Sequence, residues 1–231
     1  MKNIRTRVGP FNQRPFYTNS EIENMCIDEL QRAGLLPSTP EPIRIDRFLE
    51  KRFNISYEYD DLPSGLLGYT RFSKSGVQQI VVARSLDDSS TSNDRRVRST
   101  LAHEAGHGLM HAHLFALSGQ SSLFPEGEGP SPRVLCRDEA TPGSLRKYSG
   151  EWWEFQANRA IGDLLVPRAL AYQCLADFLE PRGLLGLRDL SDDRRVPAAK
   201  QLAEIFDVNP AVATIRIEEL FPRQNGAQGM L

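Results

Sequence analysis

The residues best suited to chemistry lie in one short segment, His103-Glu104-Ala105-Gly106-His107. Residues four apart on an α-helix point about 40° apart around its axis, so both imidazoles project from one face, one turn apart. Two imidazole nitrogens at this spacing can bind one zinc ion, and the glutamate beside them can hold the water that the ion activates. We therefore expect His103 and His107 to be metal ligands and Glu104 to be the catalytic base of a metal-assisted hydrolysis.

Short motifs of this kind also arise by chance, but two further features support a functional site. All four histidines of the chain fall within the helical segment that carries the motif: His103, His107, His111 and His113. Gly106 and Gly108 would each destabilise a helix by about 1 kcal/mol unless close packing requires them. We therefore favour a metal site over a solvated helix face, and we expect another element to pack tightly against this helix.

A catalytic zinc site usually has three protein ligands and one open position. His113 lies six residues after the second motif histidine, but it could reach the metal only if the helix broke three residues after that histidine, where the chain has Met110. Glu154 lies on a separate predicted helix, where Asn158 shares its face and could brace a motif histidine by a hydrogen bond. We favour Glu154 over His113, and Glu151 is a third candidate.

Supporting roles are less well defined by the sequence. His111 shares the face of the two motif histidines one turn further on, so we expect it to pack or to support a ligand rather than to bind the metal. Tyr148 and Tyr172 are candidates for stabilising an oxyanion by residue type alone.

The composition is that of an ordinary globular protein. The chain has 231 residues, 40% of them hydrophobic, which is enough for a sizeable core. A net charge of -2 supplies no strong attraction to nucleic acid or to an anionic membrane, which argues against direct binding to either. The sequence has neither an apolar run of the roughly 20 residues that cross a bilayer nor the apolar core of a secretory signal, so we expect a cytoplasmic protein.

Hydrophobic periodicity and chain breakers predict the elements around the motif. Alternation predicts a small antiparallel sheet, with strands over 55–60, 66–72 and 77–83. The motif helix should run from about Asp94 to His113, and Ser118 to Gly150 is predicted to be a long loop. Other helices are expected over 20–33, 42–52, 151–165, 168–179, 197–206 and 210–220. A substrate strand would pair with an exposed edge of the sheet, for which we choose Val77 to Ala83.

Three stretches resemble the ImmA/IrrE family of bacterial and phage metallopeptidases. Arg98 to His111, RSTLAHEAGHGLMH, is similar to the motif helix of that family. Glu154 to Asn158, continuing through Leu164 to Pro167, is similar to its second signature. Leu202 to Arg216 is similar, more weakly, to its closing helix pair. The resemblance covers the chain from about Pro42 to Phe221.

The resemblance implies a zinc-dependent peptidase with His103, His107 and Glu154 as ligands and Glu104 as catalytic base. We expect one zinc ion per chain, with Mn²⁺ as an alternative ion. The fold implied is α+β, with the small antiparallel sheet packed beside the HExxH helix and a mostly helical C-terminal half. The substrate implied is a helix-turn-helix transcriptional repressor, whose cleavage would relieve repression.

We predict three segments on this basis. Residues 1–34 form an N-terminal arm and helix, 35–180 a zinc metallopeptidase domain, and 181–231 a C-terminal helical subdomain with a helix-turn-helix-like pair.

Two other classes of function stay open at this stage. Ala198 to Glu218 has the outline of a helix-turn-helix, which would make the protein a DNA-binding regulator. Its second helix, however, offers DNA only Arg216, among acidic neighbours. A metal-sensing or metal-bound interaction protein without proteolysis would keep the ligands, but it would have no need of Glu104 as a base.

Overall fold

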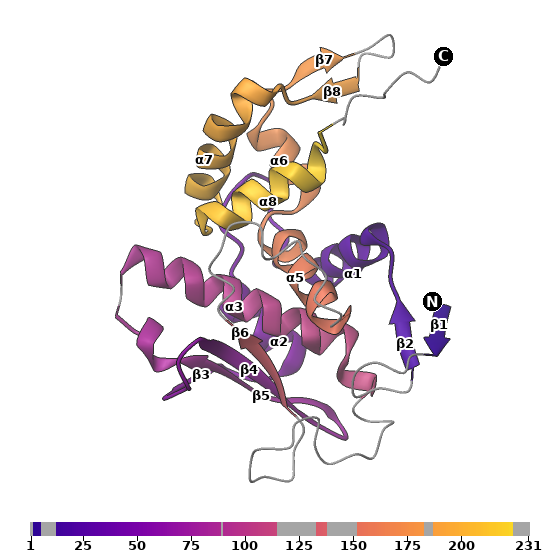
Figure 1. Cartoon of the computed structure of the whole chain (residues 1–231), viewed down its shortest axis with the longest axis vertical. Coiled ribbons are helices and arrows are strands. Elements are labelled where there is room, and N and C mark those ends of the chain that lie inside the picture. The colour runs from indigo at the N-terminus through magenta and orange to yellow at the C-terminus, as the bar shows by residue number, and fades with distance from the viewer. Residues whose placement is uncertain are drawn as a thin grey trace.

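The computed structural model describes residues 2–5, 13–88, 90–114, 133–137, 152–182 and 187–223. A four-stranded sheet lies against the motif helix α3 (Thr91–Met110) in the lower half of Figure 1. The strand order is β3 (Glu58–Asp60), β5 (Gly76–Ala83), β4 (Leu66–Ser73), β6 (Arg133–Arg137). The predicted α+β class is confirmed.

The sheet differs from the prediction in two ways. It is mixed rather than wholly antiparallel, because β3 pairs parallel with β5. β5 is also an interior strand, and β3 pairs with its Val81–Ala83 half while β4 pairs along its other side. The choice of Val77 to Ala83 as an exposed edge for a substrate is therefore wrong for that half. Among the described strands, the sheet ends at β3 on one side and at β6 on the other.

Most predicted helices are present, with shifted ends. The chain forms α1 (Asn19–Arg32), α2 (Ile45–Phe53), α5 (Trp152–Leu165), α6 (Arg168–Cys174), α7 (Arg195–Ile205) and α8 (Pro210–Leu220). Helix α3 begins earlier than predicted because the Ser90 side chain accepts a hydrogen bond from the backbone of Asn93. Helix α1 begins at Asn19, one residue earlier than predicted, because the Thr18 side chain accepts a hydrogen bond from the backbone of Glu21.

The sequence patterns missed the short strands. A hairpin of β1 (Lys2–Arg5) and β2 (Gln13–Phe16) precedes α1, and a hairpin of β7 (Glu180–Arg182) and β8 (Leu187–Asp189) precedes α7. β6 lies inside the predicted 118–150 loop, and the rest of that loop is outside the described residues.

Close packing around α3 positions the motif. A Cβ atom on Gly106 would lie 2.9 Å from Cβ of Ala160 and 3.1 Å from Cα of Ala157, so α5 can approach α3 only because residue 106 is glycine. A Cβ atom on Gly108 would lie 2.7 Å from the ring of Phe53 on α2. The close packing predicted from these glycines is confirmed, and it brings the first turn of α5 over the motif histidines.

Within the described residues, the larger of two hydrophobic clusters extends through most of the fold. A single cluster of buried side chains includes Ile22 on α1, Leu101 on α3, Leu164 on α5 and Phe221 after α8. The core therefore takes in residues of all three predicted segments. No helix in the described part of the chain is long and apolar enough to cross a membrane.

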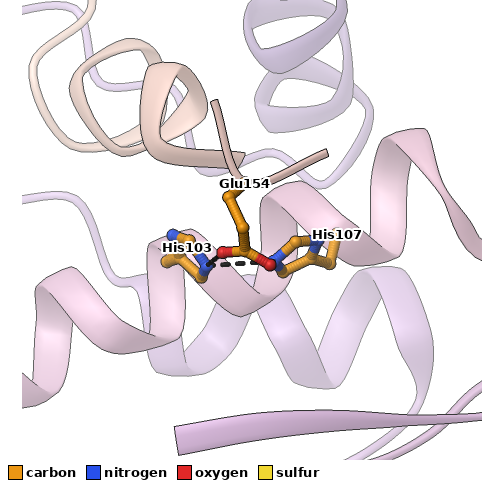
Figure 2. Close-up of side chains that lie close together, drawn as sticks. All are labelled: His103, His107 and Glu154. Atoms are coloured by element: carbon orange, nitrogen blue, oxygen red, sulfur yellow. Dashed lines mark hydrogen bonds and ion pairs between the residues drawn. The ribbon is translucent and has the colours of Figure 1, made fainter. Parts of the chain in front are cut away.

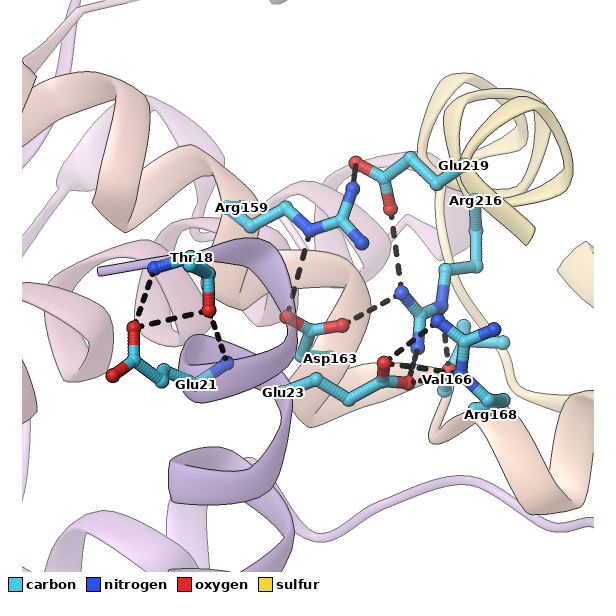
Figure 3. Close-up of polar contacts among 9 residues, drawn as sticks. All are labelled: Thr18, Glu21, Glu23, Arg159, Asp163, Val166, Arg168, Arg216 and Glu219. Carbon is cyan, nitrogen blue, oxygen red and sulfur yellow. Dashed lines mark hydrogen bonds and ion pairs between the residues drawn. The ribbon is translucent and has the colours of Figure 1, made fainter. Parts of the chain in front are cut away.

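Buried ion pairs join α8 to the rest of the fold (Figure 3). Arg216 is 0% exposed, and its guanidinium lies 2.6 Å from Asp163 on α5 and 3.1 Å from Glu23 on α1. Its Nε donates to the carbonyl oxygen of Val166 at 3.0 Å. Arg216 is the one basic residue of α8. In this fold it holds three helices together and is not available to contact nucleic acid.

We expect Arg216→Met to lower the free energy of unfolding by about 3–5 kcal/mol, because Asp163 and Glu23 would lose a buried partner. Urea denaturation measures this change. Lys200→Met is the control, since Lys200 and Glu204 are exposed and 4.0 Å apart, and it should change stability by less than about 1 kcal/mol. Equal effects of the two substitutions would contradict the role assigned to Arg216.

Candidate metal centre

Three side chains converge between α3 and the first turn of α5 (Figure 2). The Nε2 atoms of His103 and His107 are 2.9 Å apart. The carboxylate oxygens of Glu154 lie 3.1 Å from Nε2 of His103 and 3.5 Å from Nε2 of His107. Within the described residues, this is the one group of three or more His, Cys, Asp or Glu side chains close enough to hold a metal ion.

The hydrogen bond of His103 determines which of its nitrogens carries the proton. Its Nδ1 lies 2.9 Å from Oδ1 of Asn158, an oxygen that can only accept. Nδ1 is therefore the donor, and in a neutral ring Nε2 then has a lone pair. The predicted contact between Asn158 and a motif histidine is thus present.

His107 is oriented in the same way by His111. Nδ1 of His107 lies 3.0 Å from Nδ1 of His111, whose Nε2 lies 2.9 Å from Oε1 of Gln156. Because that oxygen only accepts, His111 donates from Nε2 and accepts at Nδ1. Burial, with a smaller contribution from His107, lowers the pKa of His111 to about 3 and keeps its ring neutral. His107 therefore donates from Nδ1 and has a lone pair on Nε2.

Two lone pairs and a carboxylate consequently face one another. Burial would raise the pKa of Glu154, but positive charge at His107 and hydrogen bonds from His103 and His107 outweigh it and lower that pKa, so ionisation of Glu154 depends on positive charge beside it. Burial also lowers the pKa of His107, which disfavours a protonated ring as the balancing positive charge. Burying an ionised carboxylate against two lone pairs costs free energy unless a cation lies among these atoms.

The spacing of the three groups fits a metal ion. Ligand atoms bound at about 2.0–2.2 Å to a tetrahedral zinc ion lie about 3.3 Å from one another. The three distances between His103, His107 and Glu154 are 2.9, 3.1 and 3.5 Å. Small movements of the side chains would therefore complete a site with these residues.

Glu104 is fully buried between α3 and the sheet. Its Oε2 accepts a hydrogen bond from Oγ1 of Thr70 on β4 at 2.5 Å, and its Oε1 has no hydrogen-bond partner within the described residues. Burial raises the pKa of Glu104 to about 8, although His103 and the Thr70 hydroxyl oppose the shift. A nearby metal ion would lower this pKa, because positive charge favours the carboxylate.

The structure does not place the other predicted ligands and oxyanion-stabilising residues in the cluster of His103, His107 and Glu154. His113 is exposed at the end of the motif segment and is not among the three clustered side chains. Glu151 and Tyr148 lie outside the described residues. Tyr172 packs against Phe221, with ring centroids 5.1 Å apart, so the structure gives it no role at the centre.

Two residues that hydrogen-bond to side chains of the site were not predicted from the sequence: Thr70, which donates to Glu104, and Gln156, which accepts from His111. Thr70 is 0% exposed, and Gln156 is 2% exposed. A polar residue within the mostly apolar strand 66–72 was a signal for Thr70, since buried hydroxyls need partners. Gln156 gave no such signal, because its partners lie far away in the sequence.

We expect metal-free protein to lose stability relative to Glu104→Gln as the pH rises from about 5 to about 8. The folded-state pKa of Glu104 is raised from 4.5 to about 8, so the folded protein binds more protons over this interval. Each pH unit should then cost the wild type up to about 1.4 kcal/mol that the variant does not lose.

Urea denaturation at several pH values, with a chelator present, measures this difference. Glu204→Gln, at an exposed carboxylate on α7, is the matched control and should follow the wild type. Parallel pH profiles for the wild type and Glu104→Gln would contradict the burial of an ionisable Glu104.

No model of a known protein family matches the sequence, and no curated protein matches it. The function of the centre is therefore inferred from its geometry and from the motif residues that build it.

Proposed function

We propose that the protein is a zinc-dependent metallopeptidase of the ImmA/IrrE type, with His103, His107 and Glu154 as metal ligands and Glu104 as general base. The main support for this proposal is the convergence of Nε2 of His103, Nε2 of His107 and the carboxylate of Glu154. Two histidines and a glutamate are a ligand set of catalytic zinc sites, whereas structural sites usually have four protein ligands.

Zinc bound here would act as a Lewis acid and lower the pKa of a water molecule toward neutrality. Glu104 would accept a proton from the attacking water and pass it to the departing amine. The Thr70 hydroxyl holds one carboxylate oxygen of Glu104, which leaves Oε1 for that proton. Burial excludes bulk water from this carboxylate and so strengthens its interactions with charge nearby.

Access to the centre is best from the side of Glu154. Its side chain is 19% exposed, whereas those of His103 and His107 are 3% and 0% exposed. We propose that a protein substrate approaches over the start of α5. A helix-turn-helix repressor in the cytoplasm is the proposed substrate, on the basis of the motif resemblance.

The two alternative functions are less well supported. Direct DNA binding through α8 would need Arg216, which is buried in ion pairs with Asp163 and Glu23. A metal-sensing protein without proteolysis would not need a buried carboxylate beside the ligands. Activity measurements on a Glu104 variant separate this second alternative from a peptidase.

We expect purified wild-type protein to hold about one zinc ion per chain, measured by mass spectrometry under native conditions. Glu154→Ala should lose the metal, because only two protein ligands remain, and His113→Ala should keep it, because His113 is exposed and outside the group. Loss of metal from His113→Ala with retention by Glu154→Ala would contradict the ligand assignment.

We expect Glu104→Gln to keep zinc and to lower the rate of peptide-bond cleavage by about 10²- to 10⁴-fold, the usual contribution of a general base. The assay is incubation with candidate helix-turn-helix repressors, with products identified by mass spectrometry. Glu204→Gln, at an exposed carboxylate on α7, is the control and should cleave at close to the wild-type rate. Equal cleavage by wild type and Glu104→Gln would contradict the proposed base.

A further inference from the structure

Residues far from the motif in sequence reach the metal centre through hydrogen bonds. The carboxamide of Gln156 joins two segments: its Oε1 faces Nε2 of His111 at 2.9 Å, and its Nε2 donates to the backbone carbonyl of Pro15 at 3.0 Å. Pro15 lies on β2, in the N-terminal arm that precedes α1. A continuous chain of hydrogen bonds therefore runs from the arm through Gln156 and His111 to His107.

The direction of every bond in this chain follows from the carbonyl of Pro15. A carbonyl oxygen only accepts, so Gln156 must turn its NH₂ group toward Pro15 and its oxygen toward His111. His111 must then donate from Nε2 and accept at Nδ1. A neutral His107 must in turn donate from Nδ1, which leaves its lone pair on Nε2, the atom that faces His103 and Glu154.

Because this chain of hydrogen bonds is buried, reversing the direction of its bonds would be costly. His111 is 0% exposed and Gln156 is 2% exposed, so neither can exchange a protein partner for water without local opening. Trp152 packs edge-on against His111, with ring centroids 5.5 Å apart, and holds the imidazole in place. The alternative tautomer of His111 would set two donors, or two acceptors, against each other in a dry environment.

We propose that docking of the N-terminal arm regulates metal affinity, with Gln156 as the positioning residue that couples the Pro15 carbonyl to His107. The inference rests on the proposed metal site. Docking of the arm favours the tautomer that can bind a metal, and bound metal favours the same tautomer, so each event strengthens the other by the same factor. A centre whose affinity depends on the arm can be controlled by whatever displaces the arm.

The test uses the full-length chain and zinc alone. Gln156→Met replaces the carboxamide with an apolar group of similar length and should raise the Kd for zinc about 10- to 100-fold, the usual effect of removing a residue that orients a ligand. The Kd is measured by competition with a chelator. Gln201→Met is the matched control, because Gln201 on α7 also donates from Nε2 to a backbone carbonyl, that of Cys174, at 2.8 Å, and its Kd should equal that of the wild type.

A second pair of measurements compares the wild type with Gln156→Met. Hydrogen exchange of the backbone amides of residues 13–18 should slow when zinc is added to the wild type, and this slowing should be absent in Gln156→Met. Nitrogen-15 spectra of the imidazoles should show His111 protonated at Nε2 in the wild type and a mixture of tautomers in the variant. A residue that only packs would not change the tautomer.

The outcomes separate the two proposals. If the wild type binds no zinc, the metal site and the coupling both fail. If the wild type binds zinc with a Kd that Gln156→Met leaves unchanged, and zinc does not slow exchange in residues 13–18, the coupling alone is overturned.

Discussion

Three hydrogen-bond acceptors face one another at the centre of this fold, and the surrounding structure provides the acceptors that hold the proton of each imidazole on its other nitrogen, Nδ1. Oδ1 of Asn158 accepts the Nδ1–H hydrogen bond of His103, and Nδ1 of His111 accepts that of His107. The two Nε2 lone pairs are then directed at each other and at Glu154. Such an arrangement is electrostatically unfavourable in the absence of a cation, which supports the proposed metal site.

The rest of the molecule maintains this convergence. Helix α3 supplies both histidines, but the third group comes from α5, which can lie close enough only because Gly106 has no side chain. The buried contacts of Arg216 with Asp163 and Glu23 tie the other end of α5 to α1 and α8. The distance between Glu154 and the histidines therefore depends on packing across three parts of the chain.

Local sequence patterns predicted much of this arrangement. They did not predict the contacts between segments that are far apart in the sequence. Helical spacing was sufficient to predict that His103 and His107 face each other and that Asn158 contacts one of them, because each follows from positions on a helix. The glycines of α3 correctly indicated tight packing but not its partners. The parallel pairing of β3 and the contact between Gln156 and Pro15 could not be predicted, because each joins segments whose sequences carry no mutual signal. The hairpin strands were missed because strands of three or four residues are too short for periodicity.

The central claim is that His103, His107 and Glu154 together bind a metal ion. Anomalous X-ray diffraction at the zinc edge, from crystals of the zinc-reconstituted protein, tests it most directly. We expect one strong peak about 2.0–2.2 Å from Nε2 of both histidines and from the Glu154 carboxylate. A fully reconstituted crystal without a peak at that position, or with its peak on His113, would rule out this metal site.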